Sequence, residues 1–437
     1  MSLARILLLL LLCLSSARLC RAQFLMDAID TSSAGKGALY LHKGKDMLQL
    51  SGYFQPQFQW SQSKGAKGYA GGDFPERVNN RFMLRRGRLR IDYERYNRDD
   101  MPVVQLAFQF DGTERGVAIR DFFGRFFENR WSLFSLTTGM FARPFGYEVN
   151  LSSSDRESPE RGRMSQILMK TERDLGAMIT FEPRRAGQPL RFLEVDAGLF
   201  NGQGLAGPAD FDSHKDFIGR IRVKPQRLGR AGWMLSGGVS LLYGGMEQFT
   251  PVIYRTVPGK PVFRKDSSVS NTGRIAPRHY YGADLQLKIP NRSGATLLRA
   301  EYIRGIQTGT ALSSETPPVI PEDDAGRYSP LYIRRFDGAY FYLLQNLGSE
   351  KHQLGLKYDW YDPNIRVKGR EVGAASGYTG EADMRFDTFG GGYIYYVNEH
   401  LKLTLWYDRV LNEPTSVSGL GKDLADDVFT CRLQYRF

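Results

Sequence analysis

The last eleven residues, 427–437, alternate between apolar and polar side chains and finish on an aromatic residue. The apolar parity consists of Phe429, Cys431, Leu433, Tyr435 and Phe437. A β-strand that crosses a bilayer needs about 9–11 tilted residues and an apolar face toward the lipid. Because lipid tolerates only helices and closed barrels, this segment predicts a membrane-embedded β-barrel. We expect the barrel-assembly machinery to recognise the terminal Phe437.

The beginning of the chain has the features of a secretory signal peptide. Arg5 precedes an apolar run over residues 6–12, and the small residue Ala22 provides a cleavage position. We therefore expect residues 1–22 to be a signal peptide that directs export. No long apolar run follows residue 14, so the mature chain is expected to contain no transmembrane helix. Export together with a membrane strand predicts the outer membrane of a Gram-negative bacterium.

Sixteen stretches of the mature chain have the period-2 pattern and the length of a membrane-crossing strand. They are 47–60, 82–95, 103–111, 117–127, 131–142, 172–182, 191–201, 216–225, 232–243, 278–289, 295–305, 336–346, 351–362, 386–397, 400–410 and 427–437. An even number, with long and short connections in alternation, is typical of a single-chain bacterial barrel. The sequence thus predicts an all-β fold, a transmembrane antiparallel β-barrel of about 16 strands over 47–437. Residues 23–46 are expected to form a short periplasmic segment before it.

Aromatic residues gather near the ends of these stretches, as in the girdles of outer-membrane barrels. Examples are Trp60, Trp131, Tyr243, Trp360 and Tyr407. A soluble sandwich or propeller would also explain the alternation. Such folds do not explain the strand number, the terminal aromatic and the loop asymmetry together. No repeat of 20–50 residues is visible, which disfavours a propeller.

The stretch 82–95 carries a row of arginines on one parity: Arg86, Arg88 and Arg90. An arginine on the lipid face near the membrane midplane costs roughly 2–4 kcal/mol, so this parity is expected to face the lumen. Arg85 has the opposite parity. Because it lies near the external end, we expect its side chain to reach the lipid headgroups from the outer face.

A second basic row occupies the stretch 216–225, where Arg220, Arg222 and Lys224 share one parity and apolar residues share the other. Lumenal charges of both signs could simply solvate a wide pore and pair across strands, and inward parity offers five acidic partners: Asp92, Glu94, Glu194, Asp196 and Asp284. Two rows of like charges at two-residue spacing repel one another, and this favours a functional role. Guanidinium groups are always charged and present paired donors to phosphate or carboxylate oxygens.

The formal net charge of +12 could reflect nucleic acid, an anionic membrane surface or a small anion in a pore. The position of the two rows favours small anions, phosphate among them, and no nucleic acid. The long loop 143–171 is the candidate for narrowing the bore. Its basic residues include Arg143, Arg156, Arg161 and Arg163. An ordinary solvated external loop of mixed charge would explain this segment equally well.

No enzymatic or metal chemistry is indicated. Five dispersed histidines form no ligand-spaced group, and no nucleophile elbow appears. The run Gly202-Gln203-Gly204-Leu205-Ala206-Gly207 matches a dinucleotide fingerprint, but Pro208 follows and no βαβ unit surrounds it. We expect no catalytic residue, no metal and no cofactor.

Several motifs together resemble those of the phosphate-selective porin O and P family. They are Arg85-Arg86-Gly87-Arg88-Leu89-Arg90-Ile91, Gln109-Phe110-Asp111, Gly139-Met140-Phe141-Ala142-Arg143-Pro144-Phe145-Gly146-Tyr147-Glu148, Thr171-Glu172-Arg173-Asp174-Leu175-Gly176 and Phe200-Asn201-Gly202-Gln203-Gly204. The resemblance covers about residues 47–225. It implies a homotrimer of sixteen-stranded porins with Arg86, Arg88 and Arg90 in an arginine ladder. The chain departs from that family in having no clear cluster of constriction lysines.

The leading hypothesis is therefore an outer-membrane porin for passive diffusion of small anions, including phosphate or polyphosphate. One alternative is a general or sugar-type porin in which inward aromatics such as Tyr361 and Trp406 form a slide. A further alternative is a barrel that transports nothing and acts through its long external loops. A bilayer measurement of ion selectivity separates the first two hypotheses.

Overall fold

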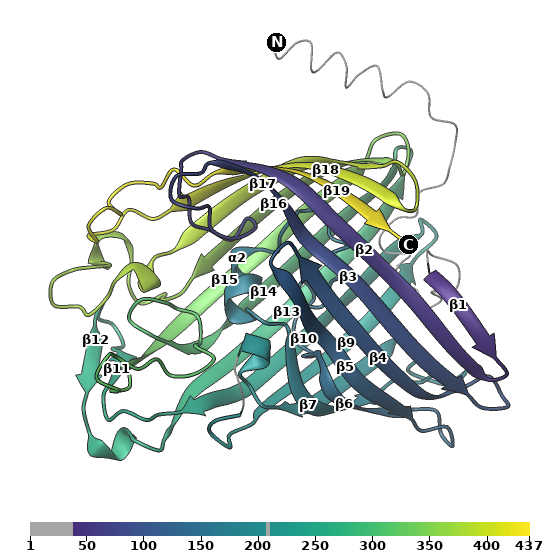
Figure 1. Ribbon diagram of the computed structural model, residues 1–437, viewed down its shortest axis with the longest axis horizontal. Coiled ribbons are helices and arrows are strands. Elements are labelled where there is room, and N and C mark those ends of the chain that lie inside the picture. Colours follow the sequence, from purple (N-terminus) through teal and green to yellow (C-terminus); the bar gives the residue numbers. More distant parts are fainter. Residues whose placement is uncertain (1–37, 207–209) are drawn as a thin grey trace, which may run out of the picture.

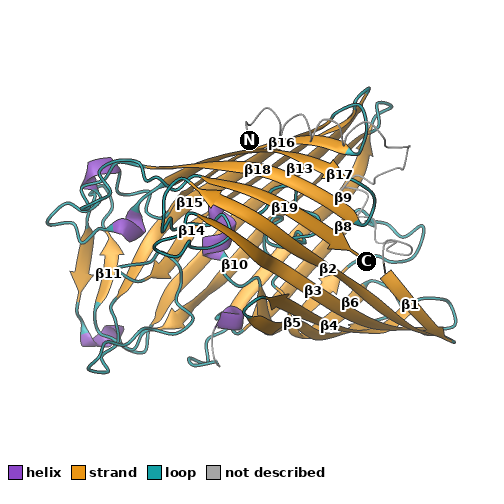
Figure 2. Cartoon of the chain, turned by 45° about the horizontal axis from the view of Figure 1, so that its top comes forward, coloured by secondary structure: helices purple, strands orange, loops and turns teal. Residues whose placement is uncertain are grey.

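A computed structural model describes residues 38–206 and 210–437. The signal peptide expected over 1–22 and the first part of the segment 23–46 lie outside the described residues. A ring of antiparallel strands dominates the structure (Figures 1 and 2). Among the described helices, none is long and apolar enough to cross a membrane.

Sixteen strands form the wall of the barrel, and each pairs with the next strand of the wall. They are β2 (Asp46–Ser61), β3 (Asn80–Tyr96), β4 (Pro102–Thr113), β5 (Gly116–Phe127), β6 (Phe134–Ala142), β7 (Arg173–Phe181), β8 (Leu193–Phe200), β9 (Asp216–Leu228), β10 (Trp233–Glu247), β13 (Ile275–Asn291), β14 (Gly294–Gly309), β15 (Leu331–Asn346), β16 (His352–Asp362), β17 (Phe386–Tyr396), β18 (Leu401–Asn412) and β19 (Val428–Arg436). The last strand pairs with the first, Val428 opposite Ser61, and closes the cylinder. The predicted sixteen-stranded antiparallel barrel is confirmed.

Three further strands lie outside the wall and were not expected from the sequence. β1 (Ala38–Lys43) forms a hairpin with the start of β2 and lies within 23–46, which was expected to be a short periplasmic segment. β11 (Ile253–Thr256) and β12 (Phe263–Asp266) form a hairpin in the long connection after β10. β11 also runs parallel to the first residues of β15, so this external loop is attached to the barrel rim.

Alternation along each wall strand separates a lipid-facing surface from a lumen-facing one. In β2, Phe54 and Trp60 are exposed on the outer surface, whereas Gln55, Gln57 and Gln59 are buried inside. The same division runs around the barrel. Because the barrel is closed, backbone N–H and C=O groups of each wall strand can pair with those of its two neighbours, and the apolar outer surface can face lipid.

A bulge in β3 changes the parity of this strand. Between the pairs Pro56–Leu84 and Phe54–Gly87, β3 advances three residues while β2 advances two. The extra residue lets the adjacent Arg85 and Arg86 both turn toward the lumen. The expectation that Arg85 faces the headgroups was therefore wrong, because alternation does not continue through a bulge.

Candidate functional site

The connection between β6 and β7 folds into the barrel instead of standing above it, and its short helix α2 (Arg163–Leu168) lies within the ring (Figure 1). The loop contacts several parts of the wall. The hydroxyls of Ser153 and Tyr53 of β2 are 2.6 Å apart, and those of Ser158 and Tyr342 of β15 are 2.7 Å apart. The segment 143–172 thus narrows the bore from inside.

One side of the loop packs against an apolar part of the inner wall. Met164, Ile167 and Leu168 of α2 belong to one buried cluster with inward residues such as Phe336 and Trp406. This cluster extends over β6–β10 and β13–β18. Burial of so much apolar surface fixes the loop against this part of the barrel. The remaining lumen, along β19 and β2–β5, is lined mainly by polar and charged side chains.

The two aromatics proposed as a sugar slide lie in this apolar cluster. Tyr361 and Trp406 are each only 1% exposed. The indole of Trp406 packs against backbone glycines, with Gly355, Gly390 and Gly392 leaving no room for a Cβ. Both side chains point inward as expected, but neither presents a surface on which a solute could stack.

The row in β3 points into the lumen, and each member has an acidic partner. Arg86 contacts Glu160 at 2.7 Å and Arg88 contacts Asp111 at 2.9 Å. Arg90 makes a two-point contact with Asp92, with Nε to Oδ2 at 2.6 Å and Nη2 to Oδ1 at 2.7 Å. The guanidinium groups are therefore held in fixed positions by carboxylates. They do not form a row of free cations.

The row in β9 also faces inward and is paired as well. Arg220 contacts Asp284 at 2.7 Å, Arg222 pairs with Glu194, and Lys224 pairs with Glu182. The positive charge of this row is balanced, because each of its three cations pairs with one carboxylate. The balanced pairs are the arrangement expected when charges solvate a wall, which was the alternative interpretation of these residues.

Charge is unbalanced where the loop meets the β19–β7 wall. Glu160 of the loop accepts contacts from Arg85, Arg86 and Arg432, at 2.9, 2.7 and 2.8 Å. We call the group formed by Glu160 and these arginines the Glu160 triplet, after its three arginines. Three guanidinium groups on one carboxylate carry a formal net charge of +2.

A second group of the same kind surrounds Glu172 at the end of the loop. This carboxylate is 2.9 Å from Arg120, 3.7 Å from Arg173 and also pairs with Arg161. Arg173 has a further partner in Asp121, at 2.8 Å. We call the group formed by Glu172 and these arginines the Glu172 triplet, again after its three arginines. Burial of the Glu172 carboxylate alone would raise its pKa, but the arginines hold that pKa well below its usual range.

The four predicted loop arginines have different surroundings. Arg161 belongs to the Glu172 triplet, and Arg143 donates to the carbonyl of Thr171. Arg163 stacks on the ring of Phe386, with its guanidinium carbon 3.4 Å from the ring centre. Arg156 differs from all three. Its residue is 4% exposed, and its Nε and Nη1 atoms have no hydrogen-bond partner among the described residues.

Arg156 lies close to both triplets. Burial lowers its pKa well below the usual range, and the neighbouring charges of Arg161 and Arg86 add to the effect. Glu160 and Glu148 act in the opposite direction. A guanidinium so placed has unused donors in a positive region, which is the local chemistry that favours an anion.

Several important cations were not singled out in the sequence because none of them belongs to a run of three basic residues at two-residue spacing. Arg120, Arg299 and Arg432 are examples, and all three make ion pairs with the loop or its end. The alternation of each strand could show that these side chains point inward. It could not show which of them contact a loop from another part of the chain.

No group of three metal-ligating side chains occurs in the described parts of the chain, 38–206 and 210–437.

Comparison with solved structures identifies the barrel type. OprB of Pseudomonas putida aligns with a TM-score of 0.55 at 8% identity, covering 92% of this chain and 94% of that chain. The outer-membrane channel DcaP of Acinetobacter baumannii aligns with a TM-score of 0.51 at 11% identity, covering 91% and 99%. No protein-family model and no curated sequence matches the chain. The fold is that of a Gram-negative outer-membrane porin.

Proposed function

We propose that this chain is an outer-membrane porin through which small anions diffuse passively. The observation that carries the proposal is the pair of arginine triplets, each with one central glutamate. They lie on the polar side of the lumen where the loop narrows it, so the narrow region carries excess positive charge. A positive, partly desolvated constriction concentrates anions and repels cations.

Phosphate and related oxyanions are the proposed preferred class. Guanidinium groups are weakly hydrated and bind such oxygens through paired N–H donors. Arg156 has donors that no group in the described part of the chain uses, and Arg86 and Arg161 lie close to it. The resemblance of residues 47–225 to the phosphate-selective porin O and P family agrees with this class. On that resemblance we also propose a homotrimer.

A planar bilayer containing the purified protein tests this function. Under a potassium chloride gradient, the reversal potential is expected to have the sign of an anion-selective pore. Added phosphate is expected to reduce the chloride current, because it occupies the same arginine region. A pore without ion preference would support the general-porin alternative. Absence of any conductance would instead favour a barrel that acts through its loops.

Arg156→Gln is the cleanest single test of the constriction, because no carboxylate loses a partner. We expect the ratio of anion to cation permeability to fall about fivefold. One charge within several ångströms contributes on the order of 1 kcal/mol at the dielectric of a partly hydrated site. The reversal potential measures this ratio directly.

Arg163→Gln is the matched control for removal of a buried loop cation. The charged groups near Arg163 are Asp426 and Asp359, and no triplet arginine is among them. We expect its permeability ratio to stay within about twofold of wild type. An equal fall in both variants would show that the effect arises from the loop in general and would remove Arg156 from the proposed anion path.

A further inference from the structure

The external connection between β2 and β3, residues 62–79, bends inward over the mouth of the barrel. At its base, Arg81 of β3 donates to the carbonyl of Asp73 at 2.7 Å. Gln59 of β2 is paired with Arg81 in register and donates to the carbonyl of Ala70 at 2.5 Å. Because both donors lie on the inward side of the wall, they hold this part of the connection toward the lumen.

The middle of the connection reaches the helix inside the ring. The carbonyl of Tyr69 accepts a side-chain N–H of Gln166 in α2 at 2.8 Å. The ring of Tyr69 lies over Arg163, with the guanidinium carbon 4.9 Å from the ring centre. The same ring packs at the edge of the large buried apolar cluster. A segment that begins at the wall is thus attached to the constriction loop.

A further external connection, residues 310–330 between β14 and β15, meets the same tyrosine. The hydroxyl of Tyr69 donates to one oxygen of Glu315 at 2.9 Å, and Lys170 donates to the other oxygen at 2.6 Å. Burial raises the pKa of Tyr69 and the neighbouring Glu315 adds to the effect, so the hydroxyl stays protonated at neutral pH. Glu315 therefore joins three separate connections.

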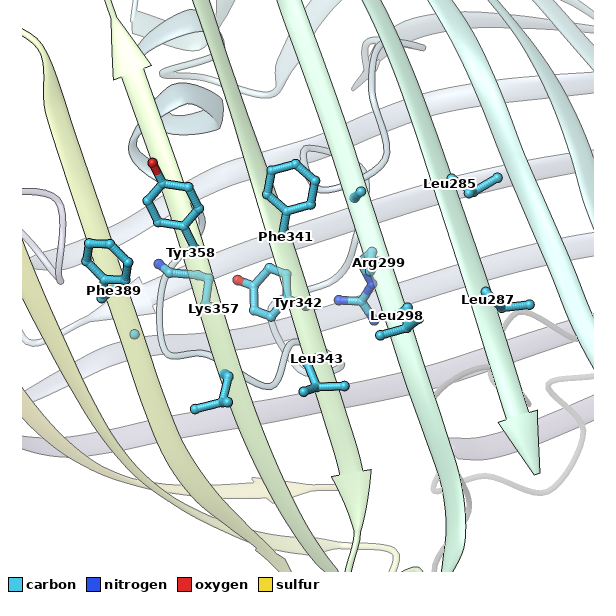
Figure 3. Close-up of a pocket in the computed structure, with 13 residues that line it drawn as sticks. Leu285, Leu287, Leu298, Arg299, Phe341, Tyr342, Leu343, Lys357, Tyr358 and Phe389 are labelled. Carbon is cyan, nitrogen blue, oxygen red and sulfur yellow. The ribbon is translucent and has the colours of Figure 1, made fainter. Parts of the chain in front are cut away.

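The helix α2 is itself held by the opposite wall. Tyr342 of β15 and Lys357 of β16 are paired in register (Figure 3). The hydroxyls of Tyr342 and Ser158 are 2.7 Å apart, and Lys357 pairs with Asp359 at 3.0 Å. Asp359 in turn accepts the N–H of Arg163, the first residue of α2, at 3.1 Å. The connection after β2 therefore rests on a helix that the wall keeps in place.

The connection after β2 also covers the side of the mouth above the Glu160 triplet. Arg85 and Arg86 belong to β3, and Arg432 belongs to β19. Apolar residues of the connection form a small buried cluster with Val428 at the start of β19. The connection therefore lies between these arginines and the external solution.

We propose that the contact of Tyr69 with Glu315 closes a strap across the external mouth, and that this strap limits the size of the solutes that enter. The strap consists of residues 62–79 and 310–330. The inference rests on the proposed porin function and adds the residues that set a size limit at its entrance. With the contact made, solutes pass beside the strap. Without it, the two parts separate and the entrance widens, while the constriction deeper in the bore is unchanged.

Single-channel recording of the purified full-length protein tests the size limit with polyethylene glycols of graded mass. A polymer that enters the pore lowers the conductance, whereas an excluded polymer does not. In Tyr69→Ala/Glu315→Ala, polymers added to one side should enter at a larger mass than in wild type. The limit from the other side should stay the same, because the strap lies at one end of the barrel. Tyr69→Phe keeps the ring without its hydroxyl and should give a smaller shift on the same side.

Hydrogen exchange of the full-length protein in detergent is a second measurement, which needs no conduction. In Tyr69→Ala/Glu315→Ala, the strap loses the hydrogen bonds that Glu315 accepts from Tyr69 and Lys170. The amides of residues 66–73 should therefore exchange roughly tenfold faster than in wild type.

The matched control is Glu322→Ala/Tyr328→Ala, which removes the same two residue types from an exposed β-bridge in 310–330. Its size limits and its exchange should equal those of wild type. Unchanged limits in Tyr69→Ala/Glu315→Ala, a shift from both sides, or an equal shift in the control would overturn the strap. A protein that conducts no ions would refute the porin function instead. The exchange measurement would then still decide whether Tyr69 and Glu315 hold the connection in place.

Discussion

Replacing Glu160 with glutamine is expected to increase anion preference and to loosen the loop. The change raises the formal charge of the Glu160 triplet from +2 to +3, because three arginines lose their one carboxylate. Leaving such buried charge uncompensated costs about 3–5 kcal/mol. Reversal potentials measure the gain in selectivity. The loss of loop docking should appear as flickering current and faster proteolysis of the loop in the folded barrel.

The companion variant neutralises all four charged side chains of the Glu160 triplet: Arg85→Gln/Arg86→Gln/Arg432→Gln/Glu160→Gln. Its local formal charge is zero, so anion preference should fall below that of wild type. The two variants share the Glu160 substitution and move charge in opposite directions, which separates electrostatics from disturbance of the loop. Selectivity that falls equally in both would contradict the role of this triplet in conduction.

Arg299→Met is expected to produce the largest loss of loop docking. Arg299 of β14 and Glu157 of the loop form an ion pair at 3.1 Å, and both side chains are only 1% exposed. Removing the arginine leaves a buried carboxylate without its cation, which costs about 3–5 kcal/mol. Hydrogen exchange of loop amides in the folded barrel, compared with wild type, measures this loss.

The double variant Arg299→Met/Glu157→Leu should recover most of the docking, because no unpaired charge remains and the replacements are apolar. Arg222→Met serves as the control, since the side chain of Arg222 is 41% exposed in its pair with Glu194. Arg222→Met should change the free energy of loop opening, measured by hydrogen exchange of the loop amides, by less than about 1 kcal/mol. If loop amides exchange as fast in the double variant as in Arg299→Met, the loop is held by the specific hydrogen bonds of Arg299. Charge compensation would then not be the cause of docking.

The barrel could be predicted from the sequence because lipid imposes one strict pattern. All sixteen predicted stretches overlap the wall strands, and the inward parity of Arg86 and Arg220 follows from the cost of charge in lipid. The course of the loop had no comparable signal. Its position depends on a buried apolar cluster that includes Phe336 and Trp406, which in sequence look like ordinary aromatics.

The sequence showed acids of inward parity, Asp92, Glu194 and Asp284 among them, but it could not assign each acid to its arginine. Arg86 meets Glu160 from a distant loop, and Arg220 meets Asp284 from a strand across two pairings. Neither contact follows from spacing along the chain. The two rows were predicted as similar ladders. The structure distinguishes them, because only the first contributes to a group in which arginines outnumber carboxylates.

The bulge in β3 is a position at which this strand can change its length. Arg81 lies on the inward side before the bulge, where it donates to Gln59, while Phe82 is 85% exposed toward lipid. Deleting either Arg85 or Arg86 would remove the extra residue and restore unbroken alternation, so Arg81 and Arg88 would stay inward and Phe82 outward. Deleting a residue elsewhere in β3 would instead turn every side chain on one side of the deletion to the opposite face, and guanidinium groups would then enter the hydrocarbon.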